Sequence, residues 1–475
     1  MAFLVGGANS AAAADTGLTN SLRFNDPDNP ILSLDIGSDG DRRQCTISMW
    51  VKKSHPTERQ MMFYQGDDNG NSEYVGLEFN ASAQLNFFAV QGGVGSAVTV
   101  MLLRSSALFR DPAAWYHIVA NIDTDQGSAA DRANIYVNGT QITDFSTTAI
   151  YPDQNTDLNI GNNADDYIIG GAAFNKSFDG YISEVYYIDG TQYAASAFGE
   201  TNDDGIWIPK EAKDDLTFGT NGFFLEFKET GTSQNSSGIG ADTSGEDNHL
   251  AVTNLAATNQ TTDTPTNNFA TFNPLMTYAD IVSNDDDLTF SEGNTKVTGG
   301  TGGTSFTPSV SSIGVSNGKW YYEFYNPTTD SGTEIAGAMN YDYSGGKGIN
   351  DAFIGIRASN GDLYNNGSTS SVGTEWKDSG DILSVKLNMD DDEISFSTNG
   401  ATYTSAVSIT GNAGADGILH PVVFLADDEV ATVNFGNPNW ALSSGNADAN
   451  GYGNFEYAVP SGYYALCTKN LAIYG

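Results

Sequence analysis

Short apolar runs recur along the whole chain, and turn-forming residues separate them. The runs at 45–51, 85–90 and 115–122 have the length of strands, and residues 178–188 alternate between apolar and polar side chains. Because successive side chains of a strand point to opposite faces, this alternation buries one face and leaves the other outside the core. Helix-spaced runs of Ala, Leu, Glu and Lys are scarce. The pattern predicts an all-β chain.

The predicted strands fall into two series. The first begins at 21–24 and ends at 222–227, whose apolar pattern suits pairing with 21–24. No helix-length crossover separates the members of the second series, which favours antiparallel pairing there. We therefore expect two antiparallel β-sandwiches, at 21–230 and at 269–475, and the second includes a C-terminal strand. Clear members of the second series lie at 319–324, 353–356, 382–387, 393–397, 420–425 and 431–436.

Two further segments lie outside the predicted sandwiches. Residues 231–268 are dominated by Thr, Ser, Asn, Gly and Asp, and we expect a polar connector there. Residues 1–20 lack the basic start of a signal peptide. We expect them to form an arm that docks on another protein, with simple disorder as the alternative. No apolar stretch approaches the roughly 20 residues that a membrane span requires.

Three segments of the first half occur in a recognisable order. They read DPAAWYHIV at 111–119, IYVNG at 135–139 and FDGYISEV at 178–185. Together they resemble the signature of the concanavalin-A-like or laminin-G-like jelly roll. The resemblance implies a lectin-like sandwich, and it says little about the ligand.

The second half is similar to a SPRY domain through four ordered segments. GKWYYEF at 318–324 matches the early strand of that family, and GDILSVKL at 380–387 with ISFSTNG at 394–400 matches its central hairpin. VNFG at 433–436 matches the closing strand. One departure is visible, because an aspartate common after the first hairpin strand is displaced into NMDDD at 388–392. The resemblance implies a second sandwich with an altered loop.

The tandem arrangement, with its ending at 455–467, resembles proteins of tailed phages of marine bacteria and cyanobacteria. In those phages, lectin-like jelly rolls serve as tail-fibre, head-fibre or capsid-decorating modules. The resemblance implies a virion location, other virion proteins as partners, attachment to a host-surface glycan or protein, and a homotrimer. A bacterial extracellular adhesin or carbohydrate-binding module is one alternative. A polysaccharide depolymerase is another.

Charge narrows the list of partners. The chain has 20 Lys and Arg against 59 Asp and Glu, which gives a formal net charge of −39. Such a chain repels the phosphate backbone of nucleic acids, so we expect no nucleic-acid partner. Only Cys45 and Cys467 are present, and two cysteines do not make a disulfide framework.

The sequence does not contain the residue spacing of a catalytic site. Jelly-roll glycosidases place two carboxylates across a cleft, and no Glu-x-Asp-x-Glu pattern occurs. Glu184 with Asp189, and Asp390 with Glu393, have the wrong spacing for such a pair. The four histidines are far apart, which fits neither zinc ligation nor a nucleophile triad. We therefore expect that the protein is not an enzyme and has no catalytic residue, and the sequence identifies no cofactor with certainty.

Calcium is the one ion that the composition favours, because it binds carboxylate, amide and carbonyl oxygens in loops. The alternative for these side chains is turn chemistry, in which Asp and Asn bond their own backbone. The candidate calcium ligands are Asp26, Asp28, Asp39, Asp41, Asp165 and Asp166.

Aromatic side chains in loops are candidates for stacking on sugar rings. For each tyrosine, burial in a core is the alternative, and for Trp376 burial is the expectation. The candidate ligand-binding residues are Tyr151, Tyr167, Tyr341, Tyr343 and Tyr364.

Overall fold

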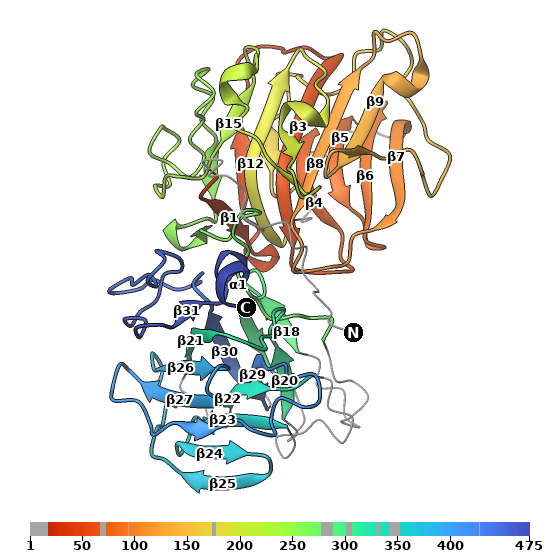
Figure 1. The fold of residues 1–475 in the computed structure, drawn as a ribbon. Coiled ribbons are helices and arrows are strands. Elements are labelled where there is room, and N and C mark those ends of the chain that lie inside the picture. Colours follow the sequence, from red (N-terminus) through yellow and green to blue (C-terminus); the bar gives the residue numbers. More distant parts are fainter. Residues whose placement is uncertain are drawn as a thin grey trace. The chain divides into compact units, whose positions relative to one another are not determined.

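The computed structural model describes residues 18–475 with gaps, and the gaps are 67–72, 94, 173–176, 277–287, 301–305, 329–331, 333, 342–351 and 427. Strands dominate both halves, which confirms the predicted all-β fold class (Figure 1). The chain divides into two units that meet in sequence between Thr266 and Asn267.

The first unit is a sandwich of two antiparallel sheets, in which Figure 1 shows β3, β8 and β12 side by side. One sheet has the order β10-β9-β8-β3-β12-β1-β17, and β15 also pairs with β12. The other has the order β16-β2-β11-β4-β5-β6-β7, and β13 and β14 form a separate hairpin. The strands are β1 (Ser21–Phe24), β2 (Ile31–Leu34), β3 (Gln44–Lys53), β4 (Gln60–Gly66), β5 (Tyr74–Phe79), β6 (Gln84–Gln91), β7 (Val98–Leu108), β8 (Tyr116–Asp123), β9 (Ala133–Val137), β10 (Thr140–Gln141), β11 (Tyr167–Ile169), β12 (Gly180–Asp189), β13 (Gly199–Thr201), β14 (Trp207–Pro209), β15 (Phe223–Leu225), β16 (Ala251–Thr253) and β17 (Gln260–Thr261). Short 3-10 turns lie at Asp26–Asp28, Ala129–Asp131, Ala195–Ala197, Lys213–Asp215 and Ala257–Asn259.

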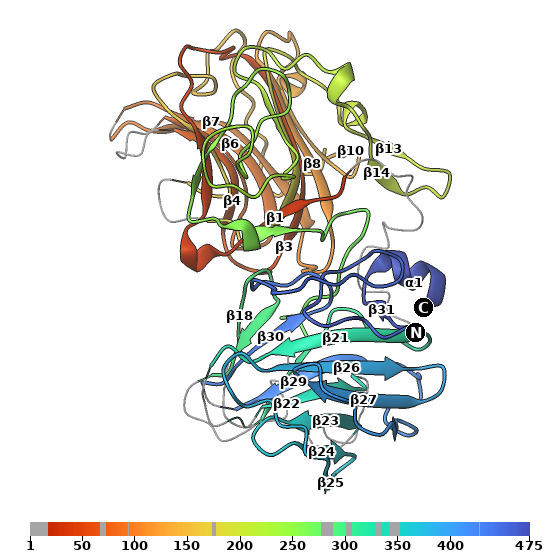
Figure 2. The same ribbon diagram turned by 90° about the vertical axis from the view of Figure 1, so that its left-hand side faces the viewer.

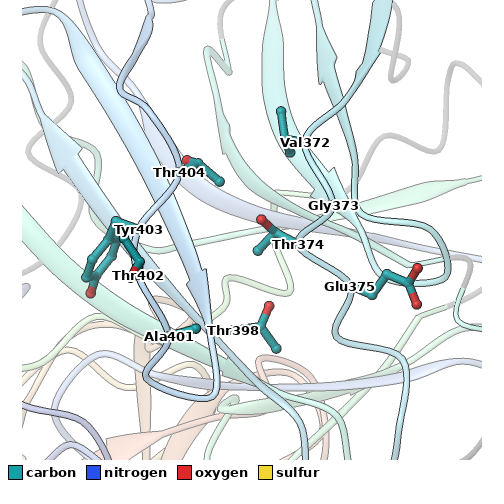
Figure 3. Close-up of a pocket in the computed structure, with 9 residues that line it drawn as sticks. All are labelled: Val372, Gly373, Thr374, Glu375, Thr398, Ala401, Thr402, Tyr403 and Thr404. Carbon is teal, nitrogen blue, oxygen red and sulfur yellow. The ribbon is translucent and has the colours of Figure 1, made fainter.

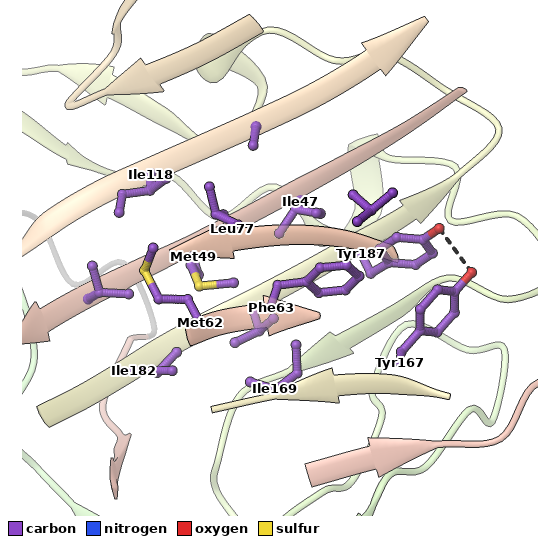
Figure 4. Close-up of a cluster of buried hydrophobic side chains, with 14 of the residues drawn as sticks. Ile47, Met49, Met62, Phe63, Leu77, Ile118, Tyr167, Ile169, Ile182 and Tyr187 are labelled. Atoms are coloured by element: carbon purple, nitrogen blue, oxygen red, sulfur yellow. Dashed lines mark hydrogen bonds between the residues drawn. The ribbon is translucent and has the colours of Figure 1, made fainter. Parts of the chain in front are cut away.

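The core of the first unit lies between its two sheets (Figure 4). Met49 of β3, Phe63 of β4 and Tyr187 of β12 are fully buried there. The rings of Phe63 and Tyr187 stack with centroids 5.7 Å apart. The hydroxyl of Tyr167 donates a hydrogen bond of 2.9 Å to that of Tyr187, so a polar pair is satisfied inside the apolar core.

The backbone geometry explains why the FDGY segment contains a glycine. Gly180 opens β12 with a φ of +142°, and a Cβ on it would lie 2.1 Å from the carbonyl oxygen of Lys52. Only glycine fits this close approach of β12 to β3. Further along β12, the register against β3 shifts between Ser183 and Tyr186. Glu184 lies at this bulge with a φ of +49° and is buried.

Two details of the first unit differ from the sequence-based expectation. Strand β15 does not pair with β1. Both pair with β12, at Val185–Tyr187 and at Gly180–Ile182 respectively. The expected connector 231–268 belongs to the first unit as far as Thr266, because β16 extends one sheet beside β2 and β17 extends the other beside β1. Its few apolar residues, among them Ile239, Leu250 and Leu255, are buried in the core of the first unit, so the segment needs no core of its own.

The second unit is also a sandwich. One sheet has the order β18-β19-β30-β21-β26-β27-β28 and the other β20-β29-β22-β23-β24-β25. The pairings are antiparallel except that β31 runs parallel to β21 (Figure 2). The elements are β18 (Thr289–Ser291), β19 (Lys296–Thr298), β20 (Thr307–Val310), β21 (Lys319–Tyr325), β22 (Ile335–Met339), β23 (Phe353–Arg357), β24 (Asp362–Asn365), β25 (Ser368–Ser371), β26 (Ile382–Asn388), β27 (Glu393–Thr398), β28 (Val407–Ser408), β29 (His420–Leu425), β30 (Val430–Asn434), β31 (Tyr464–Ala465) and α1 (Thr468–Tyr474).

Strand β21 carries the core of the second unit on one face. Trp320, Tyr322 and Phe324 alternate along it and are fully buried. Trp376 is also fully buried, and its indole N–H donates to the carbonyl oxygen of Ile356 at 3.3 Å. The expectation that Trp376 belongs to the core is confirmed.

Candidate functional site

The other face of β21 is covered by the C-terminal part of the chain. Glu323 projects from this face and is fully buried. Its Oε1 accepts hydrogen bonds from the Tyr321 hydroxyl at 2.8 Å and the Tyr457 backbone N–H at 2.9 Å. Its Oε2 accepts from the Asn434 amide at 3.2 Å and the Glu456 N–H at 3.0 Å. We call this carboxylate and its four donors the Glu323 clasp.

The Glu323 clasp fixes the returning chain on the sheet. The ring of Phe455 packs against Tyr321 with centroids 4.9 Å apart, and β31 then pairs with β21. Burial raises the pKa of Glu323, whereas the four donors act in the opposite direction. Sequence reasoning identified this glutamate only as part of a motif. Apart from Tyr321, which is two residues away, its partners lie more than 100 residues away in the sequence, and no local pattern connects them.

A depression opens elsewhere on the second unit, beside the turn that follows β27. Asn399 and Gly400 form this turn with φ values of +52° and +69°, as an Asn-Gly dipeptide readily does. The chain then runs back along β27, and the Thr404 N–H donates to the carbonyl oxygen of Phe396 at 2.8 Å. Facing it are residues 372–375, which follow β25. Between the two segments lies a cavity of about 340 Å³ (Figure 3).

Threonines dominate the walls of this depression. Thr374 and Thr398 face its interior (Figure 3), and Thr398 Oγ1 is buried with no hydrogen-bond partner in the described part of the chain. Glu375 is the one charged residue of the lining, and Lys377 neutralises it with an Nζ to Oε2 distance of 2.6 Å. The ring of Tyr403 points away from Thr374 in Figure 3, and it lies under the amine of Lys386 at 4.1 Å. We call this site, lined by residues 372–375, 398 and 401–404, the threonine depression.

The threonine depression suits recognition better than chemistry. Its hydroxyl and methyl groups offer hydrogen bonds and apolar contact to an uncharged polar ligand. A volume of about 340 Å³ accommodates a small ligand or part of a larger one. It holds one carboxylate, and hydrolysis of a glycosidic bond usually requires two.

The candidate tyrosines do not line the threonine depression. Tyr167 lies in β11 and is fully buried, so the expectation of an exposed loop position is wrong. Tyr151 is half-buried and packs on the core of the first unit. Tyr341 and Tyr364 pack on one apolar cluster of the second unit, and Arg357 Nη1 donates to the Tyr364 hydroxyl at 3.2 Å. Tyr343 lies outside the described residues.

The candidate calcium ligands take part mainly in turn hydrogen bonds. Asp41 Oδ1 accepts from the backbone N–H groups of Arg43 and Gln44 at 2.8 and 3.0 Å. The remaining acidic candidates lie in comparable surroundings. Asp28 accepts from Asn25, Asp39 from the Asn163 N–H and Asp165 from Asn159, whereas Asp26 lies in a 3-10 turn and Asp166 lies beside Asp165 before β11. Across the described ranges, no group of three or more His, Cys, Asp or Glu is placed to hold a metal ion.

One Ser-His pair cannot be recognised in the sequence, because only the register of β3 against β8 brings the two residues together. Ser48 Oγ lies 2.9 Å from His117 Nε2, and the Trp207 indole N–H donates to Nδ1 at 3.0 Å. Since Nδ1 accepts, the proton of the neutral ring is on Nε2, and His117 cannot remove a proton from Ser48. Burial lowers the pKa of His117 to about 3. The pair is a buried structural contact rather than an activated nucleophile.

Glu184 and Asp189, the carboxylates nearest to catalytic spacing in the sequence, are held in separate surroundings. Asp189 accepts from the backbone N–H groups of Asp41 and Asn221 at 2.6 and 3.2 Å. Glu184 is held apart at the bulge of β12, where burial, followed by repulsion from Glu226, raises its pKa to about 8. Glu184 lies in the strand predicted at 178–188, and the bulge gives its side chain a buried position.

Comparison with known proteins agrees with this geometry. Residues 29–196 match the model of the concanavalin A-like lectin/glucanases superfamily, and residues 319–438 match that of the SPRY domain. The chain thus contains a lectin-like domain followed by a SPRY domain. Both are domain types that typically bind other molecules. No curated protein matches the chain.

Solved structures resemble each half of the chain at low sequence identity. The SPRY domain of human HERC1 is 20% identical, with 34% of this chain and 96% of that chain covered and a TM-score of 0.28. The heptameric SAP-like pentraxin of Limulus polyphemus is 17% identical, with coverages of 38% and 80% and a TM-score of 0.28. A human SPRY domain is 18% identical, with coverages of 29% and 90% and a TM-score of 0.23. Within the described ranges, no helix has the length and apolar character needed to cross a membrane.

Proposed function

We propose that this protein is a surface component of a phage particle that attaches the particle to a host-surface glycan or protein. The observation that supports binding most directly is the threonine depression, an open polar site with one ion-paired carboxylate on a SPRY domain. The lectin-like domain beside it in the sequence adds a second module of a binding type. The net charge of −39 suits a protein that works in salt and does not gather nucleic acid.

The virion location is tested by electron microscopy of intact particles labelled with an antibody against the full chain. Label on tail, head fibre or capsid would support the proposal and would also distinguish these positions. Particles that carry the protein's gene but bind no antibody would contradict it. An export of the protein to the surface of the producing cell would instead favour an adhesin or a carbohydrate-binding module.

Recognition through the threonine depression is tested on a glycan array with the full chain. Thr402 is exposed in the lining, and Thr402→Trp should fill the depression and weaken binding at least about tenfold, because the ligand loses its hydrogen bonds and its space. Ala441→Trp is the matched control, since Ala441 is exposed in the same unit and is not among the lining residues. Equal binding by both variants would contradict this site. Release of shortened glycan during the assay would favour a depolymerase.

A further inference from the structure

A lysine and an aspartate meet in the interior of the first unit. Lys52 near the end of β3 and Asp263, which follows β17, are 1% and 0% exposed, and Lys52 Nζ lies 2.6 Å from Asp263 Oδ2. More than 200 residues separate them in the sequence. Leu18, Trp115 and Tyr181 form part of the apolar cluster at this position. The contact therefore links two distant parts of the chain in a place from which water is excluded.

Hydrogen bonds hold Asp263 in place beside the Lys52 amine. The Asp263 backbone is fixed at both ends, because its N–H donates to Thr261 Oγ1 at 2.8 Å and its carbonyl oxygen accepts from Ser21 Oγ at 2.6 Å. The indole N–H of Trp115 donates to Asp263 Oδ1 at 3.1 Å. Thus one carboxyl oxygen has a hydrogen-bond donor, and the other faces the amine. Groups held within about 3.5 Å in one orientation react as if at very high concentration.

Burial also favours the uncharged form of the Lys52 amine. Desolvation lowers the pKa of the Lys52 amine, and the carboxylate of Asp263 acts in the opposite direction. Transfer of one proton from Lys52 to Asp263 would leave a neutral amine beside a carboxylic acid, and this removes two charges from an apolar site. These are the protonation states in which an amine attacks a carboxyl carbon.

We propose that Lys52 and Asp263 condense to an intramolecular isopeptide bond. The neutral Lys52 Nζ attacks Asp263 Cγ, and the bond from Cγ to Oδ2 breaks. The amine gives up one proton to the departing hydroxyl, so one water leaves and an amide remains, with no oxidant or further reactant. Trp115 stabilises the negative charge that develops on Oδ1. The bond would join β3 to the last segment of the first unit. This inference goes beyond the proposed function and does not depend on it.

Intact mass spectrometry of the full, folded chain tests the proposal. The expected mass is lower than the sequence mass by one water, and digestion should release one branched peptide that contains both Lys52 and Asp263. Lys52→Arg keeps the positive charge but should restore the full mass, because a guanidinium does not form this amide. Lys228→Arg is the control, since Lys228 is exposed and pairs with Glu226, and it should retain the loss of water.

Folding and cross-linking are separated by circular dichroism of the same samples. A folded wild-type chain with the full sequence mass and two linear peptides would overturn the proposal, whatever the variants do. The same result would leave attachment and glycan binding untouched, so failure of this inference is distinguishable from failure of the proposed function.

Discussion

The Glu323 clasp gives the sharpest quantitative prediction. In Glu323→Gln one carboxylate oxygen becomes an NH₂ group of nearly the same size. Each oxygen of Glu323 accepts two hydrogen bonds, from Tyr321 and Tyr457 on one side and from Asn434 and Glu456 on the other. If the NH₂ group takes the Oε2 side, the Asn434 amide and the Glu456 N–H lose their acceptor. If it takes the Oε1 side, the Tyr457 N–H loses its acceptor, whereas the Tyr321 hydroxyl can accept from the NH₂ group and donate to Ser384 Oγ. The substitution keeps the shape of the side chain, so the loss reports on hydrogen bonding and charge.

The magnitude follows from the number of donors left unpaired. The glutamine takes the orientation that leaves fewer donors unpaired, so the Tyr457 N–H is the donor without a partner. Such a donor costs about 1–3 kcal/mol, and we expect a loss of about 2 kcal/mol in the free energy of unfolding of the second unit. For a domain of this size, a loss of that order lowers the Tm by about 4–8 °C. The amide of Tyr457 should also exchange with solvent faster than in the wild type, because its acceptor is the altered carboxyl.

The assay is thermal unfolding of the full chain together with hydrogen exchange resolved by peptide. Glu393→Gln is the matched control, because Glu393 lies exposed on β27 of the same sheet and should change stability by less than about 0.5 kcal/mol. If Glu323→Gln were as stable as Glu393→Gln, with unchanged exchange at Tyr457, the assignment of the clasp as the anchor of the C-terminal segment would be refuted.

Three further perturbations concern the first unit. The pKa of His117, about 3, lies below the value of about 6.5 in the unfolded chain, so this residue contributes stability above pH 6.5 that is lost as the pH falls. At pH 5 the loss in the free energy of unfolding is about 2 kcal/mol. Denaturant titrations at several pH values should therefore show a flatter pH dependence for His117→Gln than for the wild type. Tyr187→Phe should cost about 1–2 kcal/mol in urea unfolding, because the hydroxyl of Tyr167 loses its buried acceptor, and an unchanged midpoint would contradict this. Gly180→Ala should cost about 2–4 kcal/mol, since its Cβ would meet the carbonyl oxygen of Lys52, and a Tm equal to the wild type would show that β12 can shift away.

Local sequence patterns were sufficient to predict the fold class and its turns. Strands β9 and β10 form a hairpin at the IYVNG segment, and its Asn138 and Gly139 take the left-handed conformations typical of this dipeptide. Likewise, the strand predicted at 319–324 is β21, whose Trp320, Tyr322 and Phe324 share one face in the core. These features depend on neighbours in sequence, and hydrophobic periodicity records them directly.

Features that depend on distant partners could not be predicted from local patterns. Tyr167 stands in a loop-like stretch, and only the insertion of the short β11 between β2 and β4 buries it. The walls of the threonine depression come from segments on either side of β26, and threonine in a turn has no pattern that distinguishes a binding site. Ser48 and His117 meet through strand register alone. A single sequence records none of these pairings.

The arrangement of β1 has a consequence for biosynthesis. This strand contains Ser21–Phe24, yet it is bonded to β12 at Gly180–Ile182 and to β17 at Gln260–Thr261. A ribosome must therefore extend the chain well past residue 261 before the first sheet can close. Such non-local pairing slows folding, and until β17 has emerged the edge of β1 that faces away from β12 lacks its partner. We expect the nascent first unit to need chaperone protection until residue 261 has left the ribosome, and a C-terminal truncation before residue 260 to leave this edge of β1 open.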